Sequence, residues 1–345
     1  MSSELWDEIH EQPDRLESVI DGNRRQVSRV GALIDGSDIG WVLIAARGTS
    51  DNAARYAQYV WGARNGLAVA SAAPSLFGGY SQPPSLEGAL VVGISQSGQS
   101  PDLVGVLEEA RRRRRPTLAI TNDPDSPLAS AADEVLALYA GEERAVAATK
   151  TYTCQLAVVA MLSEALAGEP DPGASLADLP QQVAAALELS KELDSAAAPL
   201  AEDDRCAVLA RGFQHATAFE WALKLQELAQ VLAQPYSTAD FRHGPMALVE
   251  PGFPVLAIAT AGELEDDVDE LIQSVAERGA ELLVLSDRPD HHPPGSVVHL
   301  APGVPEWLVP IPTVVAAQLA TYHLTRARGL DPDAPRGLRK VTRTV

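Results

Sequence analysis

Three ionisable residues, Glu220, Lys224 and Glu227, are spaced by four and three positions in the segment "FEWALKLQELAQ". If the segment is helical, this spacing puts them on one face, and the positions opposite are apolar. Carboxylates beside a lysine have the residue types for acid–base chemistry. A row of solvated ion pairs is the commoner meaning of such a pattern, so both interpretations stay open.

His243 follows in "DFRHGPMALVEPG", a turn rich in glycine and proline. A histidine in a loop can transfer protons near neutral pH, which makes it a candidate for acid–base catalysis. The other histidines show no spacing typical of metal ligands, and no Ser-His-Asp motif is present. We therefore expect no metal ion and no cofactor.

A run of hydroxyl groups follows an apolar segment in "VVGISQSGQSPD". If a strand ends there and a helix follows, the serines lie where open α/β sheets bind ligands and where a helix offers free N–H groups. Ser95, Ser97 and Ser100 would add donors, and Gly98 would allow close backbone approach. The pattern predicts a phosphate site without a lysine, although a plain helix cap would need only one serine.

Two other segments carry hydroxyls with the same ambiguity. "ARGTSDNAARYA" has Thr49 and Ser50 at a predicted strand end, and "ERAVAATKTYTCQLA" has Thr149 and Lys150 before a predicted helix. Each could contribute to the same crevice or cap a turn.

These residues must be positioned by α/β units, because apolar, β-branched segments alternate with helical ones along the chain. The expected strands are Trp41–Ala46, Leu90–Ile94, Thr117–Thr121, Glu134–Leu138, Cys206–Ala210, Pro254–Ala259 and Glu281–Leu285.

The two halves of the chain align with each other. One offset of 164 residues relates three pairs of strand ends: Gly48 and Gly212, Gly98 and Gly262, Asp123 and Asp287. Three matches in one register indicate a duplicated domain. The second copy reads "IATAGELED" where the first reads "GISQSGQSPD", so it has lost the serines. This loss favours a phosphate site over a cap in the first copy.

The expected organisation is a helical segment over 1–35, a first domain with a connecting helix over 36–195, a second domain over 196–328 and a tail over 329–345. The formal net charge of −20 argues against a nucleic-acid partner. The basic run Arg111 to Arg115 is expected to end a helix. No apolar run reaches membrane-spanning length, so we expect a cytoplasmic protein without a membrane partner. Cys154 and Cys206 are expected to be buried thiols.

Four segments in order resemble a known family: "GISQSGQSPD", "FEWALKLQELA", "FRHGPMALVE" and the tail "DPDAPRGLRKVT". They are similar to the isomerase half of glucosamine-6-phosphate synthases and to the wider family of tandem sugar-isomerase (SIS) domain proteins. The resemblance covers essentially the whole chain. It implies an α/β fold of two tandem flavodoxin-like domains, each a doubly wound parallel sheet with helices on both faces. It also implies a homodimer.

The resemblance further implies roles for single residues. The residues expected to hold a sugar 6-phosphate are Ser95, Gln96, Ser97 and Ser100, with Ser50 nearby and Thr49 in support. Glu227 corresponds to a base that moves a proton between C1 and C2. His243 corresponds to a ring-opening histidine supplied by the partner subunit. Lys340 matches a tail lysine near the carbonyl carbon, and Glu220 and Lys224 match helix residues that support the site.

The resemblance also bears on the reaction. The sequence begins Met1-Ser2-Ser3 and enters the isomerase-like part directly, so we expect no glutaminase domain. This favours conversion of glucosamine 6-phosphate to fructose 6-phosphate and ammonia. Alternatives are a dehydratase or lyase acting on N-acetylglucosamine 6-phosphate, a ketose/aldose phosphate isomerase, or a non-catalytic sugar-phosphate sensor. Ala148, Trp221 and Gln99 depart from the family pattern and leave the identity of the sugar open.

Overall fold

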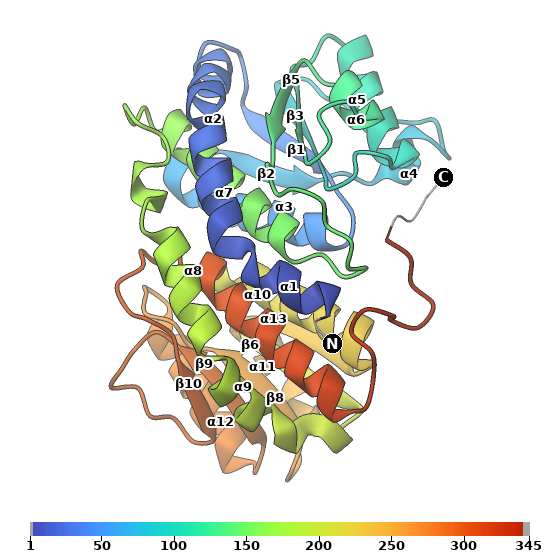
Figure 1. Cartoon of the computed structure of the whole chain (residues 1–345). Coiled ribbons are helices and arrows are strands. Elements are labelled where there is room, and N and C mark those ends of the chain that lie inside the picture. The colour runs from blue at the N-terminus through green and yellow to red at the C-terminus, as the bar shows by residue number, and fades with distance from the viewer. Residues whose placement is uncertain (1–2, 341–345) are drawn as a thin grey trace. The chain divides into compact units, whose positions relative to one another are not determined.

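The computed structural model describes residues 3–340, which form two compact units, each built on one five-stranded parallel sheet (Figure 1). The first unit comprises Asp14–Glu143, Lys150–Asp178 and the tail from Arg339. The second unit comprises the chain up to Pro13, Arg144–Thr149 and Leu179–Leu338. The expected segments 1–35 and 329–345 each extend past the described residues, by residues 1–2 and 341–345 respectively.

The sheet of the first unit has the strand order β2-β1-β3-β4-β5. Its strands are β1 (Trp41–Ala45), β2 (Ala68–Ser71), β3 (Ala89–Ser95), β4 (Thr117–Thr121) and β5 (Glu134–Ala137). This is the flavodoxin-like order, in which chain connections leave β1 in opposite directions on the sheet. Every residue of β3 is buried, as expected of a central parallel strand that helices cover on both faces.

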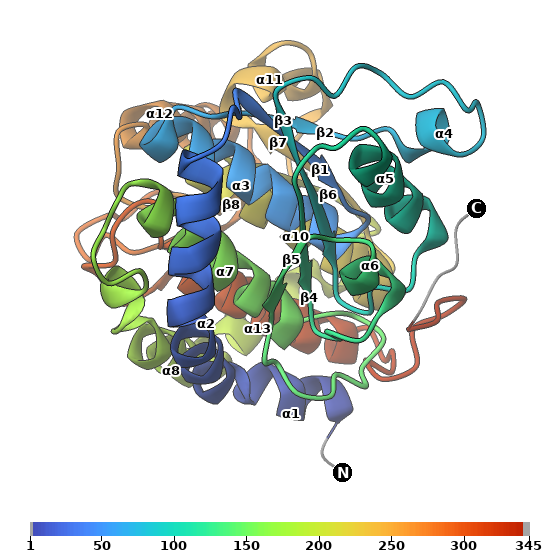
Figure 2. The same ribbon diagram turned by 90° about the horizontal axis from the view of Figure 1, so that it is seen from above.

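Helices cover both faces of this sheet (Figure 2). One face carries α2 (Gln12–Asp35), α3 (Thr49–Asn65) and α7 (Lys150–Leu166), and the other carries α5 (Pro101–Arg112) and α6 (Pro127–Ser130). The short elements are α4 (Pro74–Phe77) and η1 (Ala174–Leu176). The indole N–H of Trp61 donates to the Val159 carbonyl at 3.0 Å and joins α3 to α7. On the opposite face, Leu103 and Leu107 of α5 pack against Val91.

The second unit repeats this topology with the order β10-β9-β8-β6-β7. Its strands are β6 (Arg205–Ala210), β7 (Leu232–Ser237), β8 (Pro254–Ile258), β9 (Glu281–Ser286) and β10 (Ser296–His299). The same order appears in the first sheet when the equivalent strands are matched. Trp41 and Arg205, which begin β1 and β6, are 164 residues apart, which is the offset of the sequence repeat. The duplicated α/β fold is therefore confirmed.

The helices of the second unit also lie on both faces of its sheet. The helices on one face are α8 (Leu179–Glu188), α9 (Ser190–Ala197), α10 (His215–Lys224) and α13 (Pro310–Ala327), and those on the other are α11 (Thr238–Arg242) and α12 (Glu265–Glu277). The remaining elements are α1 (Glu4–His10), η2 (Ala198–Glu202), η3 (Gly212–Gln214), η4 (Leu225–Ala229) and η5 (Pro245–Leu248). Val268, Leu271 and Ile272 of α12 fill the core against Val255 and Val284.

All seven expected strands are present, and their ends differ from the expected ends by at most one residue. The sequence analysis did not predict β2, β7 or β10, each of which is an edge strand. Their residues are mostly exposed or half-buried, so they lack the apolar run that reveals a central strand.

The structure also tests the expectations for the basic run, the two cysteines and membrane-spanning helices. The basic run ends α5, as predicted, since the helix stops at Arg112. Cys154 and Cys206 are both buried free thiols, and burial raises the pKa of each above its usual value. Within residues 3–340, no helix is long and apolar enough to cross a membrane.

Candidate active site

The serine-rich loop of the first unit connects β3 to α5. β3 ends at Ser95 and α5 begins at Pro101, so the loop follows the carboxyl end of a central strand. β1 and β3 are neighbours in the sheet, and the chain crosses to opposite sides from them. Ligands of open α/β sheets bind at this kind of switch point. The fold therefore puts the predicted phosphate loop in a ligand-binding position.

Gly98 fixes the conformation of this loop. Its φ of +62° lies in the left-handed region, which side chains with a Cβ rarely adopt. A Cβ there would also lie 2.1 Å from the hydroxyl oxygen of Ser126. The Gly98 carbonyl accepts the Leu128 N–H at 3.1 Å, which ties the loop to α6. Only glycine fits this position.

Two serines of the loop accept hydrogen bonds from backbone N–H groups, which leaves their hydroxyl protons available for donation. The Ser95 hydroxyl accepts the Gly98 N–H at 3.1 Å, and the Ser97 hydroxyl accepts the Gln99 N–H at 3.3 Å. A serine hydroxyl is one donor and two acceptors, so each can still donate to a ligand oxygen. Ser100 precedes α5, yet its side chain makes no capping hydrogen bond. A plain helix cap therefore does not explain this serine.

Gln96 holds the other side of the loop through its main chain. Its carbonyl accepts hydrogen bonds from the Thr121 hydroxyl at 3.4 Å and from the Asn122 N–H at 3.1 Å. These bonds attach the loop to the end of β4, while the Gln96 side chain is half-buried.

The neighbouring loop after β1 carries Thr49 and Ser50 at the start of α3. Ser50 is buried, and its hydroxyl accepts from the side-chain amide of Gln155 at 2.9 Å. Arg47 in the same loop reaches Asp102 of α5, with its two nitrogens 3.0 and 2.8 Å from one carboxylate oxygen. This ion pair joins the two loops of the switch point. The sequence analysis did not single out Arg47 or Gln155.

Lys340 also lies in the first unit, where its Nζ is 2.7 Å from Oε2 of the buried Glu143. Lys150, the first residue of α7, is almost fully buried, and its Nζ donates to the Glu142 carbonyl at 2.5 Å. The sequence analysis singled out Lys150 without assigning it a role, and it did not identify Glu143.

Glu220, Lys224 and Glu227 are brought together in the second unit. The Lys224 ammonium is 2.5 Å from Oε2 of Glu227 and 3.5 Å from Oε1 of Glu220. The side chains of Glu220 and Lys224 are 0% and 2% exposed, and that of Glu227 is 24% exposed. This burial rules out a solvated row of ion pairs. The three residues form a buried charged group in which Glu227 alone reaches solvent.

The backbone around Glu227 is unusual. α10 ends at Lys224, and the next five residues, Leu225–Ala229, form a π-helical turn that contains Glu227. The turn ends at Gln230 with a φ of +56°. Single π-helical turns occur frequently at functional sites because they change the direction of one side chain.

His243 lies at the end of α11 with an exposed side chain. The segment that follows contains Leu248, which is 53% exposed. Ala148 and Trp221, two of the positions that depart from the family pattern, are half-buried and fully buried respectively. The Trp221 indole N–H has no hydrogen-bond partner among the described residues.

The candidate residues are thus divided between the units. The first unit holds the phosphate-loop serines and Lys340, and the second holds the Glu220–Lys224–Glu227 group and His243. That these residues serve one reaction stays a prediction.

The second unit has a crevice that is equivalent to the phosphate site but is filled. A Cβ on Gly262 would lie 2.3 Å from the Glu306 carboxylate, which accepts the Glu263 backbone N–H. The Gly262 N–H donates to Oε2 of Glu265 at 3.1 Å. The space that remains there is about 20 Å³. Carboxylates of the chain itself therefore occupy the donors that an anion would use.

The Glu306 carboxyl is also electrostatically strained. Burial raises its pKa above the usual value, and the charges of Glu263 and Glu265 raise it further, against the effect of the Glu263 N–H. Arg211 bonds Asp267 at 2.8 Å in this crevice, which repeats the pairing of Arg47 with Asp102.

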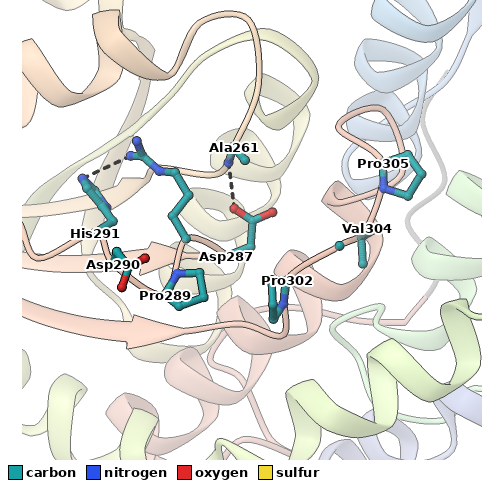
Figure 3. A pocket seen from close by; sticks show the side chains of 10 residues that line it. Ala261, Asp287, Pro289, Asp290, His291, Pro302, Val304 and Pro305 are labelled. Carbon is teal, nitrogen blue, oxygen red and sulfur yellow. Dashed lines mark hydrogen bonds between the residues drawn. The ribbon is translucent and has the colours of Figure 1, made fainter.

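A larger pocket of about 590 Å³ lies beyond β8 and β9 in the second unit (Figure 3). Its cation, Arg288, is already bonded to Asp269 at 2.5 and 2.8 Å and to His291 at 3.1 Å. Asp287 accepts the Ala261 N–H at 2.7 Å, and burial raises its pKa. The pocket is lined by carboxylates, which repel a phosphate, and its guanidinium group is already paired with Asp269.

Within residues 3–340, no group of three or more His, Cys, Asp or Glu side chains could hold a metal ion.

Comparison with known proteins gives one consistent result. The family model "SIS domain" matches the chain twice, over residues 38–165 and 199–327. A glutamine–fructose-6-phosphate aminotransferase of Thermococcus kodakarensis is 36% identical over an alignment 342 residues long, and the alignment covers 96% of this chain and 56% of that protein. The chain thus spans about half the length of the curated relatives it matches.

Two of the similar solved structures share the fold over 96% of this chain. One from Silicibacter pomeroyi DSS-3, named for a phosphosugar isomerase, is 32% identical with a TM-score of 0.88 and covers 96% of this chain and 100% of that one. The C-terminal domain of glucosamine-fructose-6-phosphate aminotransferase from Francisella tularensis is 26% identical with a TM-score of 0.87 and covers 96% and 98%.

Proposed function

The chain belongs to the SIS domain family, and on this premise we propose that it is an enzyme acting on a phosphosugar. More specifically, we propose that it converts glucosamine 6-phosphate to fructose 6-phosphate and ammonia. The observation that carries the proposal is the buried group in which Lys224 contacts Glu220 and Glu227 and leaves only Glu227 partly exposed. One accessible carboxylate, held by a buried cation, suits a base that must return its proton to the same substrate.

The reaction would proceed in four steps. His243 assists ring opening, which gives the open-chain aldehyde with its amino group on C2. Glu227 removes the proton from C2. The C2–H electrons form the C1–C2 double bond, the C1=O electrons move to oxygen, and that oxygen takes up a proton to give an enolamine. Glu227 returns the proton to C1 and the amino nitrogen loses one proton, which leaves an imine at C2 and a hydroxyl group on C1. Water adds to this carbon, and ammonia departs with the C–N electrons and a proton.

Other residues would bind and orient the substrate. The hydroxyls of Ser95, Ser97 and Ser100 donate to the 6-phosphate oxygens, since two of them retain their protons after accepting from the loop backbone. The N-terminus of α5 adds a favourable dipole. Lys340 stabilises charge at the sugar carbonyl oxygen.

The test is direct. Purified protein with glucosamine 6-phosphate should release equal amounts of ammonia and fructose 6-phosphate. Glu227→Gln keeps the shape and should lower kcat by about 10²–10⁴-fold, the range for general acid–base catalysis. Glu250→Gln is the matched control, because that glutamate is exposed in the same unit. Binding of the substrate without turnover would contradict the deaminase proposal.

A panel of hexose and hexosamine 6-phosphates, free and N-acetylated, distinguishes the related reactions. An unsaturated sugar from N-acetylglucosamine 6-phosphate would identify elimination instead. Interconversion of a ketose and an aldose phosphate would identify simple isomerisation.

We also propose a homodimer in which His243 acts in the partner's site. The exposed positions of His243 and of Leu248 beside it support this. If inactive His243→Asn and Glu227→Gln chains are mixed and allowed to exchange, half of the dimers gain one intact site. Activity should then recover to about one quarter of wild type. No recovery, with exchange shown by mass spectrometry, would contradict donation across the interface.

A further inference from the structure

Lysine is rare in this chain and is concentrated near the candidate residues. The sequence contains 27 lysines and arginines, of which only four are lysines: Lys150, Lys191, Lys224 and Lys340. Lys150 and Lys224 are almost fully buried, and the Lys340 side chain is 23% exposed. Of these four lysines, Lys191 alone is exposed. The surface cations are therefore chiefly arginines, and lysine occurs where a compact ammonium contacts buried oxygen atoms.

Lys340 contacts a carboxylate that is rigidly held. The Glu143 side chain is fully buried. Its Oε1 accepts the Thr151 N–H at 3.1 Å, and its Oε2 accepts the Thr151 hydroxyl at 2.8 Å and the Lys340 ammonium at 2.7 Å. Thr151 is the second residue of α7, where backbone N–H groups lack partners in the helix and the dipole favours an anion.

Lys150 holds the same segment from a second direction. Its buried ammonium donates to the carbonyl of Glu142, the residue before Glu143. The backbone at Glu143 is therefore fixed by Lys150 while its carboxylate is fixed by Thr151. Burial of a carboxylate without such bonds would be strongly unfavourable, so the arrangement keeps Glu143 in one position.

The tail itself does not fix Lys340. Leu330–Lys340 contains neither helix nor strand, so its backbone leaves the direction of the lysine side chain open. The contact with Glu143 supplies that direction. It is a charge-assisted hydrogen bond between residues 197 positions apart in sequence.

We propose that Glu143 is the positioning residue for Lys340 and holds its ammonium group at the N-terminus of α7, in the unit that also carries the phosphate loop. The functional part rests on the proposed function, in which Lys340 acts at the sugar carbonyl. Glu143 itself touches neither the substrate nor the reacting atoms. It acts through Lys340.

The first test needs no substrate. Intact protein is treated with a trace of acetic anhydride, and the acetylation of Lys340 relative to Lys191 is measured by peptide mass spectrometry. Glu143→Gln should raise this ratio by roughly tenfold, the factor expected when one charge-assisted hydrogen bond is lost. Glu87→Gln, a change at an exposed glutamate of the same unit, should leave it unchanged. An unchanged ratio in Glu143→Gln would overturn the proposal.

The second test separates positioning from a purely structural role. Glu143→Gln should lower kcat by roughly 10²-fold, as a small misplacement of a reacting group does, with little change in KM. In a Lys340→Met background, the same change should have no further effect on kcat. Independent, multiplicative losses would contradict action through Lys340. Glu143→Asp, which keeps the charge, should recover part of kcat.

The two tests fail in different ways. If wild type turns over no sugar phosphate, the proposed function fails, and the acetylation ratio still reports whether Glu143 holds Lys340. If Glu143→Gln does not fold, as judged by circular dichroism, Thr151→Val replaces it. That variant keeps both charges, removes one bond to Glu143, and should raise the acetylation ratio by a smaller factor.

Discussion

Replacement of Lys224 by methionine examines the charged group of the second unit directly. Methionine has a similar length and no charge, so Lys224→Met fills the space but removes the cation between Glu220 and Glu227. Lys224 is 2% exposed and Glu220 is 0% exposed, so water cannot easily replace the lost ammonium.

The expected cost follows from this burial. Removal of one member of a buried ion pair typically destabilises a protein by roughly 3–5 kcal/mol, because the remaining charge stays in a poor environment. For a folding unit of this size, each kcal/mol lowers Tm by roughly 2–4 °C, so the loss should be roughly 6–20 °C. An exposed ion pair contributes roughly 0–1 kcal/mol. The Arg205–Glu250 pair, with side chains 60% and 66% exposed, is such a pair.

Thermal unfolding of Lys224→Met, Glu250→Gln and wild type, followed by circular dichroism at neutral pH, decides the matter. A double variant with Glu220→Gln should recover part of the loss, since it removes a carboxylate that the lysine would have balanced. Should Lys224→Met melt within about 2 °C of Glu250→Gln, the group behaves as a solvated ion pair, and the reasoning from burial is wrong.

Three other changes have definite expected results. Gly98→Ala should weaken phosphosugar binding and raise KM. The new Cβ would overlap Ser126, and the left-handed φ adds roughly 1–2 kcal/mol of strain. An unchanged KM would contradict a role of this loop in phosphate binding. Ser97→Ala should raise KM by roughly tenfold with kcat little changed, whereas an equal fall in kcat would point to a catalytic role. Glu306→Gln should stabilise the protein increasingly as pH rises. The raised pKa of Glu306 means that the native state loses stability as pH climbs from the ordinary glutamate value through the raised one, and glutamine lacks this loss. Tm measured between pH 4 and 8 checks this, and a pH-independent difference would contradict it.

Much of the fold could be predicted from local patterns. Central strands such as β3 are continuous apolar runs, and a shared register revealed the duplication before any contact was known. Edge strands such as β2 and β7 lack this signal because their side chains meet solvent on at least one face. Their existence follows only from the complete sheet.

The candidate site could likewise be predicted only in part from the sequence. The serine loop and the Glu220–Lys224–Glu227 spacing are local and could be found directly. The bond between Glu143 and Lys340 joins residues far apart in sequence, so no local pattern reveals it. The π-helical turn at Glu227 likewise has no sequence signature. Arg47 could have been found, since an Arg-Gly pair recurs at Arg211 in the same register.

The filled crevice of the second unit has a consequence for how the two copies can diverge. Glu306 and Glu265 now satisfy the backbone donors near Gly262, so their bonds help to define the local structure. A single substitution that restored a serine there would still face two carboxylates and would bind no anion. A single substitution that removed one carboxylate would leave a donor exposed without a ligand to bond it. Return to a binding loop thus requires changes at several positions. The loop after β3 therefore retains serine hydroxyls that can donate to an anion, whereas the loop after β8 contains none.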